Sequence, residues 1–231
     1  MNDVQRLMFV CSANVCRSQF ASLATKKLLL SNRYHALNQL PLQVGSSGMF
    51  IPEDKKICSL INLDPFIDFM SEATLFNPLC ITQNTLIFVM ERRHQSELVS
   101  EFPQFRKQIF PMKIASLIAR KLELGVKSKK IFDGDSHDGE YSVAPYLPNS
   151  LKDRWSWIVE EFSVQRGLLQ IKSSESGLSQ FDIPDVHGIN DKSHPQMFDL
   201  IENSLGIILE AFESILDEPS MSRALIESGN E

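Results

Sequence analysis

The sequence predicts an α/β fold, an open four-stranded parallel sheet with helices on both faces. Two continuous apolar runs, residues 7–10 and 85–90, are typical of strands buried on both faces of a parallel sheet. Shorter runs at 42–44 and 108–110 predict two further strands. Segments with helical periodicity separate these runs, and such alternation is typical of a doubly wound sheet.

The predicted helices follow from apolar residues that recur at helical spacing after each strand. Pro52 is suited to the first turn of a helix, and Gly125 is suited to end one. Residues 125–150 hold Gly, Ser, Pro and a cluster of acids, so we expect a long loop there, and the polar residues 172–180 predict another loop. The predicted helices span residues 20–30, 52–63, 93–102, 114–124, 151–169 and 195–216.

The length of 231 residues fits one domain, with residues 114–180 as an accessory helical insertion and 219–231 as a frayed tail. The composition, 43% hydrophobic and 23% charged, excludes disorder as the main state. No stretch approaches the roughly 18 apolar residues of a membrane span, and the first residues lack the pattern of a secretory signal. The four cysteines are too few for a disulfide scaffold, so we expect thiols in a reducing cytoplasm.

Charge is divided unevenly along the chain, although the net charge is −6. Residues 1–130 carry 17 basic and 10 acidic residues, whereas residues 182–231 carry 2 and 11. A basic front part could favour an anionic ligand. Ordinary solvated helix faces are the simpler interpretation of the same pattern.

The most informative segment is the loop at residues 11–18, Cys-Ser-Ala-Asn-Val-Cys-Arg-Ser, between the first strand and the first helix. A loop at this place directs successive backbone N–H groups to one point, and the helix N-terminus adds positive partial charge. Cys11 lies in the same field, which stabilises a thiolate. Arg17 can close over an anion with a forked contact, and Ser18 can donate to the sulfur. These groups together suit attack on a phosphate ester.

Residues 9–18 resemble the signature of the low-molecular-weight protein tyrosine phosphatases, an apolar strand, Cys-x-Gly-Asn-Ile-Cys-Arg-Ser and a helix. Residues 44–48 are similar to the family's Val-x-Ser-Ala-Gly, and residues 86–91 to its third strand. Residues 183–188, Ile-Pro-Asp-Val-His-Gly, resemble its Ile-Pro-Asp-Pro-aromatic-Gly segment, which carries the general acid. The chain looks most like the long, actinobacterial form, and the resemblance covers roughly residues 5–113 and 181–217.

The resemblance implies a hydrolase that removes phosphate from phosphotyrosine in proteins without a cofactor. By position, Cys11 attacks phosphorus and forms a cysteinyl-phosphate, while Asp185 protonates the leaving phenolate and later helps to activate water. Arg17 and the backbone N–H groups of the loop bind the phosphoryl oxygens, and Asn14 and Ser46 brace the loop. The implied phosphate-binding residues are Ser12, Ala13, Asn14, Val15, Cys16, Arg17 and Ser18, with Ser18 and His187 as further supporting residues.

The expected partner is a phosphotyrosine-containing protein in a bacterial cytoplasm, with a tyrosine kinase as a candidate second partner. We expect no nucleic-acid partner. No metal site is expected either, because the five histidines show no metal-ligand spacing. The acidic segment 133–140 lacks the sixth-position Gly and the twelfth-position Glu of a calcium loop.

Four positions depart from the family pattern and bear on substrate preference more than on the reaction. Ala13 replaces a Gly, so a positive φ at this position would strain the loop by roughly 1 kcal/mol or more. His187 replaces an aromatic residue of the substrate cleft and would stack less well on a phenol ring. The other two departures are Gln19 and Val186, each in place of Pro.

Several alternatives stay open at the level of the sequence. An arsenate reductase shares this fold and loop but needs a relay of further cysteines, for which Cys80 is the only candidate. A catalytically weak phosphate-binding module is a third possibility. Asp182 is the next candidate for the acid. Cys16 could form a protective disulfide with Cys11 or pack the start of the helix, whereas Cys58 and Cys80 are expected to be packing thiols.

Overall fold

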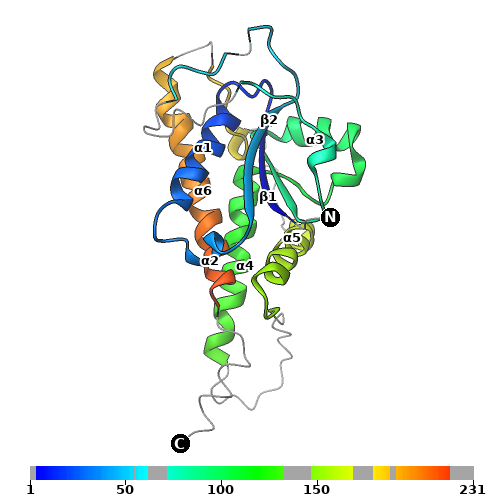
Figure 1. The fold of residues 1–231 in the computed structure, drawn as a ribbon, viewed down its shortest axis with the longest axis vertical. Helices are drawn as coiled ribbons and strands as arrows, with labels where there is room; N and C mark the ends of the chain where they lie inside the picture. Colours follow the sequence, from blue (N-terminus) through cyan, green and yellow to red (C-terminus); the bar gives the residue numbers. More distant parts are fainter. Residues whose placement is uncertain are drawn as a thin grey trace, which may run out of the picture.

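The computed structural model describes residues 4–54, 56–61, 72–132, 147–168, 179–187 and 191–218. It confirms the predicted fold, because four parallel strands form one sheet in the order β2-β1-β3-β4 with helices on both faces (Figure 1). The central strands are β1 (Gln5–Cys11) and β3 (Thr85–Val89). The edge strands are β2 (Leu42–Gly48) and β4 (Ile109–Pro111).

The strands run in one direction, so their carboxyl ends meet at one edge of the sheet. Cys11 at the end of β1 pairs with Gly48 of β2, and Val10 pairs with Val89 of β3. The chain passes from β1 to β2 on one side and then returns to β3 on the other. Open parallel sheets bind ligands at their carboxyl edge beside such a reversal. The loop after β1 therefore lies where the fold class places a ligand site.

Four helices cover one face of the sheet and enclose the main core with it. Leu7 and Phe9 of β1 and Phe88 of β3 are fully buried on this face. The rings of Phe88 and Phe110 both pack against Phe162, which lies on one of these helices. The helices are α1 (Arg17–Leu29), α4 (Met112–Phe132), α5 (Leu151–Leu168) and α6 (His194–Leu216).

The opposite face carries a smaller core under α3 (Arg92–Glu101) and the 3-10 helix η3 (Pro103–Phe105). Val10, Ile87 and Val89 point to this face, because successive side chains of a strand alternate between the two sides. Both faces of the central strands are thus apolar, which explains why their sequences are continuous apolar runs. The remaining short elements are α2 (His35–Asn38), η2 (Pro78–Cys80), η4 (Ser179–Phe181) and η5 (Asp191–Ser193).

Two predictions about helices are wrong. The described residues of the predicted helix 52–63 form turns and irregular chain; position 55 and positions beyond 61 lie outside the described residues. The predicted helix 114–124 begins earlier and continues through Gly125 as part of α4. Glycine inside a helix costs about 1 kcal/mol relative to alanine, but buried Leu122 and Val126 continue the apolar stripe across it. The first part of the predicted loop 125–150, up to residue 132, is therefore helical, whereas residues 147–150 are irregular; positions 133–146 lie outside the described residues.

Helix α5 packs into the same core as the sheet. Trp155, Ile158 and Phe162 are fully buried, and the Trp155 indole N–H donates to the carbonyl of Asn84 at 2.9 Å. The ring of Trp155 also meets Phe212 of α6 edge to face. The predicted tail 219–231 lies outside the described residues. In the part of the chain that the structure describes, no helix is both long and apolar enough to cross a membrane.

Candidate active site

The predicted phosphate loop connects β1 to α1 at the carboxyl edge of the sheet. Cys11 is the last residue of β1, Cys16 is the N-cap of α1, and Arg17 is the first helical residue. The two residues that follow β2 hold this loop from one side. The N–H groups of Met49 and Phe50 both donate to the Ser12 carbonyl, at 2.7 and 3.0 Å. The N-terminus of a helix thus faces the position that an anion would take.

Gly48 allows β2 to approach the loop closely. A Cβ at this position would lie 2.7 Å from the carbonyl carbon of Ala13 and 2.8 Å from the nitrogen of Asn14. Both neighbours are backbone atoms, so a larger residue would have to displace the loop itself. The glycine that ends β2 is therefore required by the packing of the loop rather than by a turn.

The side chain of Asn14 makes hydrogen bonds inside the loop and to the segment that follows β2. Its amide donates to the Ser18 hydroxyl at 2.8 Å, and its Oδ1 accepts the backbone N–H of Thr74 at 2.9 Å. With φ of 55°, Asn14 is the one non-glycine residue at positive φ in the described part of the chain. Asparagine tolerates this conformation better than most residues. The strain expected at Ala13 is therefore absent, because the left-handed position of the loop falls one residue later.

The predicted nucleophile is buried at the bottom of the loop. Cys11 is 3% exposed, and its Sγ lies 3.0 Å from the Oγ of Ser18. Because the amide of Asn14 donates to this hydroxyl, the Ser18 proton is available to the Cys11 sulfur. A hydroxyl proton directed at the sulfur stabilises a thiolate, which is the nucleophilic form of cysteine.

Arg17 is buried and bound by two carboxylates. Its Nη1 forms an ion pair with Glu91 and donates to the Ile183 carbonyl at 3.0 Å. Its Nη2 lies 2.5 Å from Asp185 Oδ2 and 3.4 Å from the Ser12 hydroxyl. Burial alone would raise the pKa of the Glu91 carboxyl, but hydrogen bonds from Arg17 and Arg93 hold it below its usual value. Glu91 is therefore a fixed counter-ion that orients the guanidinium over the loop.

The structure separates the two aspartates that were candidates for the acid. Asp185 faces Arg17, and its side chain is 38% exposed, so a ligand can reach it. Asp182 instead accepts the backbone N–H of Arg92 at 2.8 Å, at the start of α3. The segment that carries both is attached to the end of β3, where the N–H of Ile183 donates to the Met90 carbonyl at 2.8 Å. Of the two aspartates, Asp185 is the one in contact with the loop.

His94 contacts the loop, although it is not among the site residues predicted from the sequence. Its Nδ1 accepts the backbone N–H of Glu91 at 3.2 Å, and its Nε2 lies 2.9 Å from the Ser12 hydroxyl. A neutral ring with an accepting Nδ1 carries its proton on Nε2 and donates it to Ser12. Burial lowers the pKa of His94 to about 4, with the nearby cations Arg17 and Arg93 adding to the fall and Glu91 and Asp185 opposing it.

Glu91, which sequence reasoning also does not select, follows the last residue of β3 by two positions and is the N-cap of α3. A polar residue at the carboxyl end of a central strand is the signal that could have identified it. Ser46, which was expected to brace the loop, makes no side-chain hydrogen bond to it in the described part of the chain. The Ser46 carbonyl accepts the Thr74 hydroxyl at 3.0 Å, and Ser18 lies 3.4 Å from the carbonyl of Ser47.

The cysteines other than Cys11 have distinct surroundings. Cys16 and Cys58 are buried and share a thiol hydrogen bond. Burial raises the pKa of the Cys16 thiol, and the charge and hydrogen bond of Cys58 add to the rise. Cys80 is exposed, so its prediction as a packing thiol is wrong.

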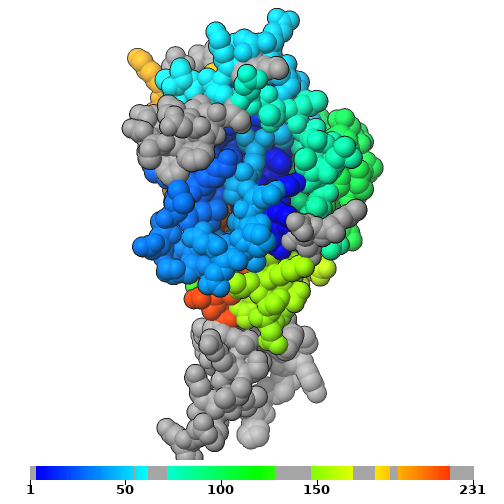
Figure 2. All heavy atoms as spheres, in the orientation of Figure 1, coloured from blue at the N-terminus to red at the C-terminus, as the bar shows by residue number. Residues whose placement is uncertain are grey.

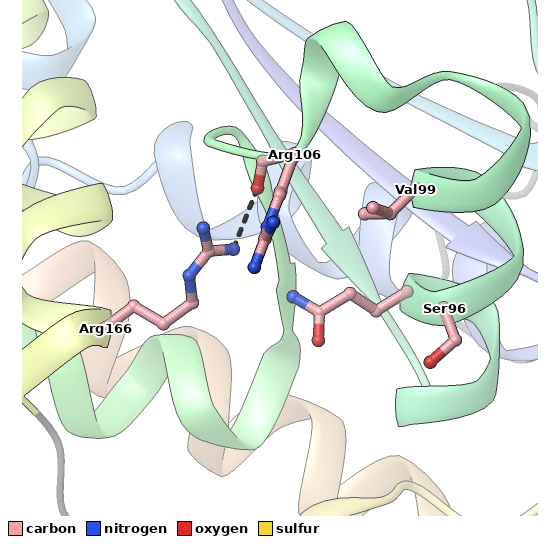
Figure 3. A pocket seen from close by; sticks show the side chains of 5 residues that line it. Ser96, Val99, Arg106 and Arg166 are labelled. Carbon is pink, nitrogen blue, oxygen red and sulfur yellow. Dashed lines mark hydrogen bonds between the residues drawn. The ribbon is translucent and has the colours of Figure 1, made fainter.

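A separate pocket lies away from the loop. It has a volume of about 290 Å³ and opens between α3, the chain after η3 and α5 (Figure 3). Figure 3 shows the guanidinium of Arg166 donating to the carbonyl of Arg106, at 2.8 Å. The lining contains no cysteine and no carboxylate, so it lacks the thiolate and the acid that a cysteine-based phosphate ester chemistry needs. The lining residues are Gln95, Ser96, Val99, Arg106 and Arg166.

Comparison with solved structures decides the fold. The tyrosine phosphatase Wzb from Escherichia coli K30, in complex with phosphate, is similar with a TM-score of 0.51 and 13% identity, over 91% of this chain and 93% of that one. The low-molecular-weight protein tyrosine phosphatase of T. tengcongensis is similar with a TM-score of 0.51 and 14% identity, over 89% and 98%. This chain has the fold of the low-molecular-weight protein tyrosine phosphatases. The tyrosine phosphatase AmsI of Erwinia amylovora agrees, with a TM-score of 0.50 and 13% identity over 90% and 93%.

At these identities the likeness to the phosphatases concerns the fold. The sequence itself matches no family model, and it matches no curated protein. Within the phosphatase fold, the loop with Cys11 and Arg17 occupies the carboxyl edge of the sheet, and the segment with Asp185 crosses over it.

Proposed function

We propose that the protein is a cysteine-dependent phosphatase that hydrolyses phosphotyrosine in proteins. The observation that carries the proposal is the convergence of Cys11, Arg17 and Asp185 on one loop at the N-terminus of α1. The separation of 166 positions between Arg17 and Ile183 makes this meeting a property of the fold and not of local sequence. A thiolate, a fixed guanidinium and a reachable carboxyl are the groups that a two-step phosphoryl transfer needs.

In the first step, the Cys11 thiolate attacks phosphorus and a sulfur–phosphorus bond forms. The bond between phosphorus and the phenolic oxygen breaks, and Asp185 gives its proton to that oxygen. The backbone N–H groups of the loop and the guanidinium of Arg17 hold the three equatorial oxygens, on which negative charge gathers. To do so, Arg17 exchanges its contact with Asp185 for the phosphoryl group and keeps its contact with Glu91. The released Asp185 carboxylate takes up a proton from solvent and so becomes the acid of this step.

In the second step, water attacks the cysteinyl-phosphate and the sulfur–phosphorus bond breaks. The Asp185 carboxylate takes a proton from the water, which restores the acid, and Cys11 leaves as a thiolate. Phosphate is released, and Asp185 gives its proton to solvent when it returns to the ion pair with Arg17. The cycle needs no metal ion or cofactor because every proton and bonding pair is supplied by these side chains and water.

The depth of the nucleophile supports a phenolic ester as substrate. Cys11 is 3% exposed, so phosphorus must reach the bottom of the loop while the rest of the substrate stays outside. A tyrosyl ring holds its phosphate several ångströms from the peptide backbone, whereas a seryl phosphate lies close to it. His187 is exposed beside the acid segment and can contact the ring.

The position of Cys80 does not support an arsenate reductase. Cys80 lies at the opposite edge of the sheet from the loop, because its carbonyl is bound by Arg6 near the beginning of β1. A strand advances by about 3.3 Å per residue, so Arg6 and Cys11 are roughly 16 Å apart along β1. A disulfide relay between Cys80 and the loop would need the segment of η2 to leave this contact and move to the carboxyl edge of the sheet.

Hydrolysis of p-nitrophenyl phosphate by the wild type and by Cys11→Ser tests the proposal. We expect Cys11→Ser to lose all measurable turnover while keeping its circular dichroism spectrum, because serine is not ionised by this loop. Cys80→Ser is the matched control and should keep wild-type rates. Phosphotyrosine and phosphoserine peptides of the same sequence then test the substrate class. Turnover by Cys11→Ser, or equal rates on the two peptides, would contradict the respective part of the proposal.

A further inference from the structure

Four side chains that can bind a metal ion converge beside the phosphate loop. Their ligand atoms are two thiol sulfurs and one nitrogen from each of two imidazoles, and all lie within 4.8 Å of one another. Neither bond-making step of the proposed reaction uses these atoms, and the ring contact proposed for His187 needs the carbon edge of its imidazole and not a ligand nitrogen. The four residues are Cys16, Cys58, His187 and His194.

The cluster is assembled from three parts of the chain that are distant in the sequence. Cys16 is the N-cap of α1, and His194 is the first residue of α6. In Figure 1 these two helices lie side by side, with their first turns at the same end of the molecule. Cys58 belongs to the irregular segment 56–61, and its N–H donates to the Val15 carbonyl of the loop at 2.9 Å. His187 belongs to the acid segment, seven positions before His194. Because the two cysteines are distant from each other and from the histidines, no local spacing motif shows the complete site.

The donor set and its dimensions fit zinc. Two thiolates and two neutral imidazoles form the Cys2His2 set that Zn²⁺ prefers in closed tetrahedral sites. With zinc–sulfur bonds near 2.3 Å and zinc–nitrogen bonds near 2.0 Å, the edges of such a tetrahedron are about 3.3–3.8 Å. The observed limit of 4.8 Å exceeds these edges by about 1 Å, which small side-chain rotations can remove.

The surroundings also resemble those of a structural metal site. Cys16, Cys58 and His194 are at most 4% exposed, and His187 closes the cluster from the surface. The rings of His187 and His194 are nearly perpendicular, at 84°, so they approach the cluster from different directions. Behind them, Phe198 packs on the His194 ring and stacks on Phe20 with ring centres 4.0 Å apart. An apolar wall of this kind limits the access of water to a bound ion.

The geometry points to a structural zinc site formed by Cys16, Cys58, His187 and His194. All four positions of a tetrahedral ion are taken by protein ligands, so the ion would have no open position for substrate. Zinc would attach the irregular segment around Cys58, shown in cyan at the upper end of the molecule in Figure 2, to the first turns of α1 and α6. The expectation from the sequence that the chain has no metal site is replaced by this inference.

A bound ion would also join the two halves of the proposed active site. Cys16 directly precedes Arg17, and His187 follows Asp185 by two residues. Zinc would thus hold the loop and the acid segment at a fixed separation, and it would engage Cys16 so that this thiol cannot form a disulfide with Cys11. This consequence rests on the proposed function, whereas the binding of zinc does not.

Zinc titration of the full chain tests the inference. The reduced protein, stripped of metal, is titrated with Zn²⁺ against a chromogenic chelator, and bound metal is counted by mass spectrometry. We expect one zinc per chain, and we expect Cys58→Ser and His187→Gln each to weaken binding at least about 100-fold. His187 is exposed, so His187→Gln should fold even if Cys58→Ser does not. The matched controls are the variants Cys80→Ser and His35→Gln, which replace exposed residues outside the cluster. Both variants should bind zinc like the wild type.

Cys11→Ser separates this site from zinc captured by the proposed nucleophile. This variant has no nucleophile and should still bind one zinc, so the result does not depend on the proposed reaction. Cobalt in place of zinc should give the charge-transfer and intense visible bands of a tetrahedral thiolate site, and these bands should be lost in His187→Gln. A reduced chain that takes up no zinc would overturn the inference. So would binding that disappears in Cys11→Ser but survives in Cys58→Ser and His187→Gln.

Discussion

Two carboxylates, Glu91 and Asp185, compete with an incoming phosphoryl group for the guanidinium of Arg17. Without a phosphoryl group, the guanidinium of Arg17 is shared between Glu91 and Asp185, and the two carboxylates differ in exposure: Glu91 is 16% exposed and Asp185 is 38% exposed. The more exposed carboxylate is the one that an incoming anion can displace. Glu91 then remains as the permanent partner of Arg17, while Asp185 is released to act on the leaving group.

The role of Asp185 as the acid predicts an effect that depends on the leaving group. Asp185→Asn should slow phosphoenzyme formation from phenyl phosphate by about 10²–10⁴-fold, because a basic phenolate needs the proton. Esters whose leaving group is a stable anion should lose much less. Single-turnover rates measure this step apart from hydrolysis. Asp182→Asn is the matched control, since Asp182 caps α3 and should leave these rates unchanged. An equal loss for all leaving groups would exclude Asp185 as the acid.

His94 predicts a loss of stability in acid. Its pKa falls from 6.5 to about 4 in the folded protein, so between these values the unfolded chain binds a proton that the folded chain does not. The free energy of unfolding therefore decreases as pH falls from 6.5 to 4, by up to about 3 kcal/mol from this group. Urea unfolding at several pH values should show a flatter dependence for His94→Gln than for the wild type. The exposed His35→Gln should keep the wild-type slope, and a wild-type slope in His94→Gln would contradict the assignment.

At the scale of elements, the contact between β2 and the loop is as important as the loop's own sequence. The carboxyl end of β2 supplies Gly48, whose missing side chain leaves room for the backbone of Ala13 and Asn14. Thr74, which follows β2 in the chain, fixes the Asn14 side chain. The loop is therefore positioned by Gly48 of the adjacent strand and by Thr74 before any ligand enters.

Gly48→Ala should reduce kcat/KM by about 10²-fold, because the loop must move to avoid the new Cβ and a displacement near 1 Å is costly in a site of this kind. Secondary structure should be unchanged by circular dichroism. Gly45→Ala on the same strand is the matched control: its Cβ would meet only the flexible end of Met8, at 3.4 Å. Full activity in Gly48→Ala would show that the loop does not depend on this contact.

The elements that the sequence predicted well are those with a clear periodic pattern. The two central strands and α6 have continuous or periodic apolar patterns, and the sequence predicts all four strands and α6 to within a few residues. The sequence predicts a helix end at Gly125 from a local rule, but the buried apolar stripe of α4 continues past this residue. The segment near Cys58 has helix formers after Pro52, but its described residues are irregular. The Cys58 N–H is hydrogen-bonded to the phosphate loop, and the Cys58 thiol is buried.

The candidate site likewise contains residues that a sequence motif identifies and residues that only the fold brings together. Cys11, Arg17 and Asn14 lie in one contiguous motif, so their roles could be predicted from the sequence. Glu91 and His94 act through contacts across the sheet, with Arg17 and with Ser12, and no motif in the chain connects these positions. The meeting of Cys16 with Cys58 depends on the same long-range folding.

For the whole molecule, α5 determines whether residues 114–180 form a separate unit. Its largest side chains are buried against β3, β4 and α6, as shown by the contacts of Trp155 and Phe162. A fragment of residues 114–180 would expose these surfaces, and it is too short to bury a sizeable core of its own. We therefore expect no cooperative thermal transition from the isolated fragment. A sharp transition would instead show an independently folding domain.

Trapping of the phosphoenzyme tests the central claim most directly. The wild type is mixed with p-nitrophenyl phosphate and quenched within one turnover, and the tryptic peptide 7–17, which contains both Cys11 and Cys16, is sequenced by mass spectrometry. We predict one phosphoryl group on Cys11 in the wild type and none in Cys11→Ser. A phosphoryl group on Cys16, or steady turnover with no phosphorylated cysteine at any quench time, would contradict a mechanism based on Cys11.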